Sequence, residues 1–279
     1  MNGALAKSND LGAQSNVEPI NWGARLSAYK SADDGRAVFE LALTTSLFMF
    51  AWFTAWLALQ YSVVLGLLIA LPAGGLLVRM FALQHDCGHG ALFSSKSVND
   101  WIGRTIGVLT LTPYEYWRHS HALHHASSGN LDRRGHGDIE TLTVEEYLAL
   151  SFWRRVQYRL YRNPVVMFGL GPAYVFFFKQ RLPFEMLNKG AKPWISTLGT
   201  NVAAAVLFAG LIYLVGWQTF LLIQIPVILV AATAGVWLFY VQHQFEDTRW
   251  ERNKLAWDAI VLGRGEKFDG KASDALAAQ

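Results

Sequence analysis

Two long stretches of this chain contain no aspartate, glutamate, lysine or arginine: residues 41–78 and residues 194–242. A helix needs about 20 mainly apolar residues to cross a bilayer, so each stretch is long enough for two crossings. Each is interrupted near its middle by polar or helix-breaking residues, at 60–62 and 216–218. The alternative, a hairpin buried in a large soluble core, is disfavoured because soluble helices normally keep a polar stripe. The pattern predicts two membrane-spanning hairpins.

These observations predict an all-α integral membrane protein with four spans in two hairpins. The expected helices are 39–59 with 62–82, and 195–215 with 218–241. The composition agrees, since only 16% of the 279 residues are charged, against about 25% in soluble domains. A net charge of +3 gives no reason to expect nucleic acid, and one cysteine excludes a disulfide framework.

The remaining segments are expected to lie outside the bilayer core. Residues 1–36 are polar and lack the pattern of a signal peptide, so we expect a mobile leader. Residues 101–112 are too short to span, and residues 164–178 are interrupted by glycine and proline. Both are therefore predicted to be helices at the membrane surface.

The basic residues predict the orientation. The two hairpin tips carry none, whereas residues 153–192 carry eight. By the positive-inside tendency, this middle segment and both termini lie in the cytoplasm and the tips face the other side. The eight basic residues are Arg154, Arg155, Arg159, Arg162, Lys179, Arg181, Lys189 and Lys192.

Seven of the eight histidines lie next to the predicted spans, all on the predicted cytoplasmic face. His85 and His89 are four positions apart, which places both side chains on one side of a continuing helix. His121, His124 and His125 have spacing i, i+3 and i+4, which also favours one helix face. These histidines are His85, His89, His119, His121, His124, His125 and His243.

Clustered neutral imidazoles favour binding of a transition metal. A helical zinc protease motif would need glutamate directly after the first histidine, where this chain has Asp86. A site so rich in histidine and poor in carboxylate indicates an oxygen-activating metal centre more than a hydrolytic one. Its position at the mouth of an apolar bundle would admit a long alkyl substrate.

Three blocks of the sequence resemble a known family: HDCGHG at 85–90, WRHSHALHHASSGNLDRRGHGDIETLTVEEY at 117–147, and FYVQHQFEDTRWER at 239–252. They are similar to the membrane fatty acid desaturases of the bacterial acyl-lipid type, over about residues 40–258. The resemblance implies an O2-dependent enzyme of a bacterial inner membrane that introduces a double bond into an acyl chain. It also implies an all-histidine di-iron centre and an electron donor such as ferredoxin or a cytochrome.

Carried over residue by residue, the resemblance implies six iron ligands. His119 precedes the matched motif and is expected to support a ligand or to be incidental, and His136 is expected in a surface loop. The six implied ligands are His85, His89, His121, His124, His125 and His243.

The sequence departs from this family pattern after the fourth predicted span. The family carries a further HxxHH box there, whereas residues 244–279 contain no histidine. We therefore expect a truncated desaturase-like domain at 37–258, an atypical tail at 259–279, an incompletely held second iron and little activity of this chain alone. Two alternatives stay open: a lipid or alkane hydroxylase with the same histidine boxes, and a non-catalytic membrane remnant.

Overall fold

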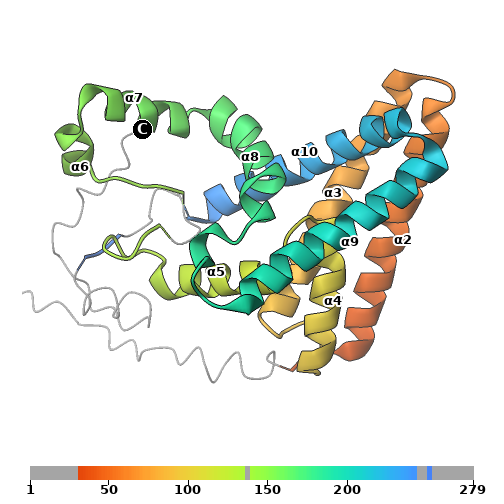
Figure 1. Cartoon of the computed structure of the whole chain (residues 1–279), viewed down its shortest axis with the longest axis horizontal. Helices are drawn as coiled ribbons and strands as arrows, with labels where there is room; N and C mark the ends of the chain where they lie inside the picture. Colours follow the sequence, from red (N-terminus) through yellow and green to blue (C-terminus); the bar gives the residue numbers. More distant parts are fainter. Residues whose placement is uncertain (1–30, 136–138, 244–249, 253–279) are drawn as a thin grey trace, which may run out of the picture. The chain divides into compact units, whose positions relative to one another are not determined.

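The computed structural model describes residues 31–135, 139–243 and 250–252. The described chain is helical, with an isolated bridge between Asn130 and Glu251, and Figure 1 shows how its helices are arranged. The predicted leader lies largely, and the predicted tail entirely, outside these ranges. The α-helices are α2 (Asp34–Leu59), α3 (Val63–Gly88), α4 (Lys96–Leu109), α5 (Tyr114–Ser127), α6 (Val144–Ala149), α7 (Phe152–Arg162), α8 (Gly171–Phe177), α9 (Ala191–Val215) and α10 (Trp217–His243).

Four of these helices, α2, α3, α9 and α10, are long and apolar enough to cross a membrane. They form the two hairpins predicted from the charge-free stretches, so the all-helical architecture with four candidate spans is confirmed. Ser62 caps the start of α3, where its hydroxyl accepts a hydrogen bond from the Leu65 amide. Hydroxyl caps of this kind satisfy one of the free amides at a helix start, which explains why the chain turns at its first polar tip.

The spans are longer than predicted at the ends that carry histidines. Helix α3 continues past residue 82 to Gly88, and α10 continues past residue 241 to His243. The loss of hydrophobicity at these points marks the expected end of the membrane-crossing segment, but nothing in the local sequence breaks the helix. The first conformation that ends α3 firmly is the positive φ of 67° at Gly90.

Helix α3 is the centre of the bundle and packs against α2, α10 and α4. A Cβ atom at Gly74 would lie 2.6 Å from Cβ of Val230, so glycine is required for the close approach of α3 and α10. Between α2 and α10, the Trp52 indole donates a hydrogen bond of 3.2 Å to buried Gln224. An apolar core would otherwise leave both polar groups without a partner.

A sharp corner joins α4 to α5 and places α5 opposite the end of α3. Leu111 adopts a positive φ of 56° at this corner. The buried Gln84 side chain accepts a hydrogen bond of 2.7 Å from the Thr110 hydroxyl and donates one of 3.1 Å to the Thr112 carbonyl. Gln84 therefore holds the residues on both sides of Leu111. Because Gln84 directly precedes His85, these bonds also fix the corner relative to the first candidate ligand.

The two segments predicted to lie at the membrane surface are helical. Residues 101–112 fall mainly in α4, and Arg104 pairs there with Glu115 of α5. Residues 164–178 contain a π-helix, Val166–Leu170, followed by α8. That these helices lie at a bilayer surface stays a prediction.

Candidate metal centre

The first two candidate ligands end helix α3. His85 lies in its last turn and His89 caps it, with the His89 amide bonded to the His85 carbonyl at 3.1 Å. The helix therefore continues through the i, i+4 pair, and both imidazoles share one side as predicted. Their Nε2 atoms are 3.3 Å apart.

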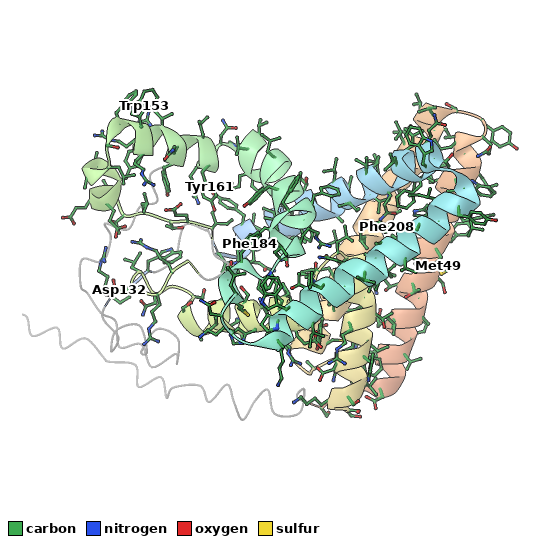
Figure 2. The ribbon with its side chains drawn as sticks, in the orientation of Figure 1. Met49, Asp132, Trp153, Tyr161, Phe184 and Phe208 are labelled. Carbon is green, nitrogen blue, oxygen red and sulfur yellow. The ribbon has the colours of Figure 1, made fainter. Side chains whose placement is uncertain are left out.

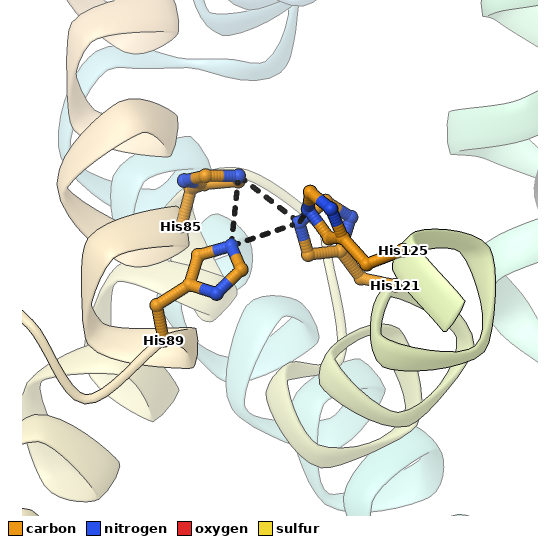
Figure 3. Close-up of side chains that lie close together, drawn as sticks. All are labelled: His85, His89, His121 and His125. Atoms are coloured by element: carbon orange, nitrogen blue, oxygen red, sulfur yellow. Dashed lines mark hydrogen bonds between the residues drawn. The ribbon is translucent and has the colours of Figure 1, made fainter. Parts of the chain in front are cut away.

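Helix α5 presents two more imidazoles to this pair (Figure 3). The Nε2 atom of His121 lies 3.0 Å from that of His85, 3.2 Å from that of His89 and 3.0 Å from that of His125. One ligand atom from each of these four residues lies within 4.8 Å of every other. We call His85, His89, His121 and His125 the four-histidine cluster.

Hydrogen bonds among the imidazoles do not account for this convergence. A neutral imidazole nitrogen either donates one hydrogen or offers one lone pair, yet Nε2 of His121 faces three other nitrogens at 3.0–3.2 Å. Nitrogens bonded to one ion at about 2.1 Å are separated by about 3.0 Å at right angles and about 3.4 Å at tetrahedral angles. The cluster therefore fits the donor set of a transition metal.

The other two candidate ligands form a separate pair, His124 of α5 and His243 at the end of α10. Their Nε2 atoms are 2.8 Å apart, and His124 is buried. Nδ1 of His243 lies 2.8 Å from the Phe239 carbonyl, which can only accept a hydrogen bond. In the neutral ring the hydrogen is therefore on Nδ1, and Nε2 carries the lone pair that a metal needs.

The structure thus divides the six candidates between two neighbouring groups. Side chains three and four positions after His121 point about 100° apart on a helix, so His125 faces α3 while His124 faces α10. The ring of His124 still lies only 5.7 Å from that of His125. The expectation of one shared face for all three residues holds for His121 and His125.

Comparison with known proteins matches these residues to one family. The fatty acid desaturase family model matches residues 54–262, which contain all six candidate histidines. The chain belongs to the fatty acid desaturase family.

Several curated members of the desaturase family resemble this chain. It is 44% identical to a fatty acid desaturase of Bacillus subtilis over 82% of this chain and 65% of that protein. It is 30% identical to an sn-1 acyl-lipid omega-3 desaturase (ferredoxin) of Synechocystis over 64% of this chain and 50% of that protein. A Nostoc protein of the same description is 26% identical over 77% of this chain and 60% of its own length. The chain spans about half to two thirds of the length of these desaturases.

Burial and mutual repulsion lower the pKa values of three imidazoles in this desaturase-family chain, those of His89, His121 and His125. Burial, followed by repulsion from the neighbouring His85 and His125, lowers the pKa of His121 to about 3. The pKa values of His89 and His125 are lowered by the same two causes, with burial again the larger. Neutral imidazole is the form that binds a metal, and the lowered pKa favours that form in these three residues.

Two aromatic residues that sequence reasoning missed hold the cluster of the desaturase fold in place. Trp117 stacks on His121 with ring centroids 4.7 Å apart and planes 15° apart. A Cβ atom at Gly88 would lie 2.8 Å from the Trp117 ring, so glycine makes room for it. The buried Tyr114 hydroxyl donates a hydrogen bond of 2.8 Å to the Cys87 carbonyl between the two histidines of α3. The sequence feature that could have identified Trp117 is its position four residues before His121, which places the two side chains on one side of a helix.

Four further residues lie near the candidate ligands in the sequence: Asp86, Cys87, His119 and His136. Asp86 is exposed and places Oδ1 3.4 Å from Nδ1 of His85, where a carboxylate orients an imidazole. Cys87 is buried between the two histidines of α3. His119 is exposed and belongs to neither histidine group, and His136 lies outside the described residues.

Proposed function

We propose that this chain forms the metal-binding membrane part of an enzyme that introduces a double bond into a fatty acyl chain. The observation that carries the proposal is the convergence of four imidazole nitrogens from α3 and α5 at the end of an apolar helix bundle. Membership of the desaturase family supplies the reaction class. The balanced reaction removes two hydrogens from adjacent methylenes and, with O2, two electrons and two protons, yields two waters.

Iron is the metal we propose, held by the four-histidine cluster together with the pair His124 and His243. When bound, iron supplies the redox chemistry by which O2 oxidises an unactivated C–H bond. An all-imidazole donor set suits such a metal, whereas a hydrolytic zinc site would need a nearby general base. Asp86, directed at the far nitrogen of His85, is better placed to orient that ligand than to act as a base.

The chain's own residues prepare the site in three ways. Trp117 and Tyr114 fix the positions of α5 and the end of α3, so the imidazoles need little rearrangement to receive an ion. The Phe239 carbonyl holds the hydrogen of His243 on Nδ1. The apolar helices α2, α3, α9 and α10 let an acyl chain approach from the bilayer without entering water.

We further propose an acyl-lipid substrate and a ferredoxin-like electron donor. Two similar proteins are described as acyl-lipid desaturases that use ferredoxin, which supports both assignments. The eight basic residues of 153–192 support an orientation with this segment, the termini and the metal site in the cytoplasm of a bacterium.

Expression in a host that lacks its own desaturase tests the function. The chain and its His121→Ala variant are expressed at matched levels, and lipid fatty acids and bound iron are measured for both. We expect the native sequence to bind iron and, as this chain alone, to form only a low level of unsaturated chains, and we expect the variant to lose both. Hydroxylated chains would establish a hydroxylase instead, and bound iron without any product would identify a metal-binding remnant.

A further inference from the structure

Helix α7 presents an apolar face that no other described residue covers. Phe152 is 68% exposed, Trp153 73% and Leu160 56%. At about 100° per residue, these three side chains and Val156 fall within roughly 100° of the helix circumference. Three large, exposed apolar side chains on one helix face need an explanation, because a water-soluble surface rarely concentrates them in this way.

The opposite face of α7 holds the helix on the protein. Tyr158 is buried, and its hydroxyl accepts a hydrogen bond of 3.3 Å from the Leu142 amide. Arg155 donates to the Leu150 carbonyl at 3.0 Å. In Figure 2, Trp153 lies on the outer side of α7, whereas Tyr161 lies on the inner side. The exposed apolar face is therefore the face that points outward.

An arginine borders this face. The sequence of α7, FWRRVQYRLYR, contains four arginines and no acidic residue. Arg159 is exposed about 20° outside the apolar arc, whereas Arg154 is exposed about 100° beyond its other edge. The Arg159 guanidinium donates a hydrogen bond of 2.6 Å to the Tyr147 hydroxyl. Aromatic residues flanked by guanidinium groups are typical of helices that lie in the membrane surface and contact anionic headgroups.

The last residue of α7 and the segment that follows it contact α10 near its end. The Arg162 guanidinium lies 5.5 Å from the centre of the Tyr240 ring, and the Phe168 ring lies 5.6 Å from it. The Thr233 hydroxyl donates a hydrogen bond of 2.7 Å to the Phe168 carbonyl. Tyr240 is in the last turn of α10, close to His243, so α7 is held near the end of a candidate span.

We propose that α7 is an in-plane membrane anchor whose apolar face enters the headgroup region of a bilayer rich in anionic phospholipid. Phe152, Trp153 and Leu160 contact the lipid, and Arg159 binds a headgroup phosphate. An acidic protein would satisfy the arginines but would leave the aromatic face without an apolar partner, so a lipid surface fits both features. This anchor does not depend on the proposed desaturase activity.

Single-cysteine labelling of the full chain tests the anchor. The native sequence has one cysteine, Cys87, and it is buried. Leu160→Cys and Arg154→Cys are labelled with an environment-sensitive fluorophore and reconstituted into vesicles of zwitterionic phospholipid, with or without anionic phosphatidylglycerol. Unsubstituted protein measures background labelling, and flotation confirms that each variant is inserted.

We expect the label at Leu160 to be quenched by lipid carrying a shallow nitroxide and to be protected several-fold from iodide, with the reverse pattern at Arg154. Phosphatidylglycerol should move the fluorophore at position 160 deeper into the bilayer. Arg159→Glu should reduce this effect of phosphatidylglycerol. Equal exposure of both labels to iodide in inserted protein would overturn the anchor. Burial of Leu160 that is the same with and without phosphatidylglycerol would overturn the anionic-lipid part of the proposal.

Discussion

Nε2 of His124 and Nε2 of His243 lie 2.8 Å apart although 119 positions separate them in the sequence. The contact joins the end of the last span to α5, beside the four-histidine cluster. His243 also stacks on Phe239, with ring centroids 4.3 Å apart. Both the ring orientation and the tautomer of His243 are therefore set by its own helix before any ion is bound.

If this pair binds metal, His243→Ala should weaken iron binding by about tenfold or more, since even the loss of a supporting partner costs this much. Gln242→Ala is the matched control, because Gln242 is the preceding residue and is exposed. Iron per protein is measured after purification and dialysis against a weak chelator. Equal iron retention in the two variants would remove His243 from the ligand set.

His121 should be the most sensitive position of the four-histidine cluster, since its Nε2 atom faces those of the other three members. His121→Ala is expected to abolish most iron binding, whereas His119→Ala, on the same helix but exposed, should bind as the native chain does. Metal analysis and the optical spectrum of the purified proteins provide the measurement. A comparable loss in His119→Ala would mean that disturbance of α5, and not ligand removal, lowers the iron content.

Gly88→Ala should displace Trp117 from its stack on His121. The new methyl group would lie 2.8 Å from the indole ring, and we expect about 10–100-fold weaker metal binding, as for other residues that orient ligands. Gly75→Ala is the control, because its methyl group would meet nothing within 4 Å on the same helix. Isothermal titration with iron or a spectroscopic substitute compares the two. Unchanged affinity in Gly88→Ala would show that the stack does not position His121.

The sequence was sufficient to predict the architecture because charge is so costly inside a bilayer. The absence of charge at 41–78 and 194–242 allowed few folds other than two hairpins. The i, i+4 spacing of His85 and His89 likewise predicted their shared face, since a helix has a fixed period. Helix ends were less predictable, because α3 and α10 continue beyond the apolar residues that revealed them.

The division of the histidines into two groups could not be predicted. Local spacing gives the angle between His124 and His125 but not the direction in which α5 faces its neighbours. That direction is set by the Leu111 corner and by Gln84, a buried amide that resembles any other glutamine in the sequence. Trp117 was equally hard to recognise, because it is one of 11 tryptophans in the chain.

The low pKa of His121 predicts how the metal-free protein responds to acid. Its folded-state pKa of about 3 is below the unfolded value of about 6.5, so between these values the unfolded chain binds a proton that the folded chain does not. Stability should therefore fall as pH decreases through this window. After chelation, the native chain should lose more thermal stability between about pH 7 and about pH 5 than His121→Asn, which lacks this group. Equal losses in the two proteins would contradict the assignment.

The hairpin tip at Tyr61 should face the non-cytoplasmic side, because the basic residues that favour the cytoplasm lie in 153–192. Tyr61 is 87% exposed, and Lys189, within the basic segment, is also exposed. In intact cells, Tyr61→Cys should react with a membrane-impermeant maleimide and Lys189→Cys should react only after permeabilisation. Trp217→Cys at the second tip should behave as Tyr61→Cys does. The reverse labelling pattern would show that the orientation is opposite to the one predicted. Different results at the two tips would contradict an arrangement in which α3 and α10 both end at the candidate metal site.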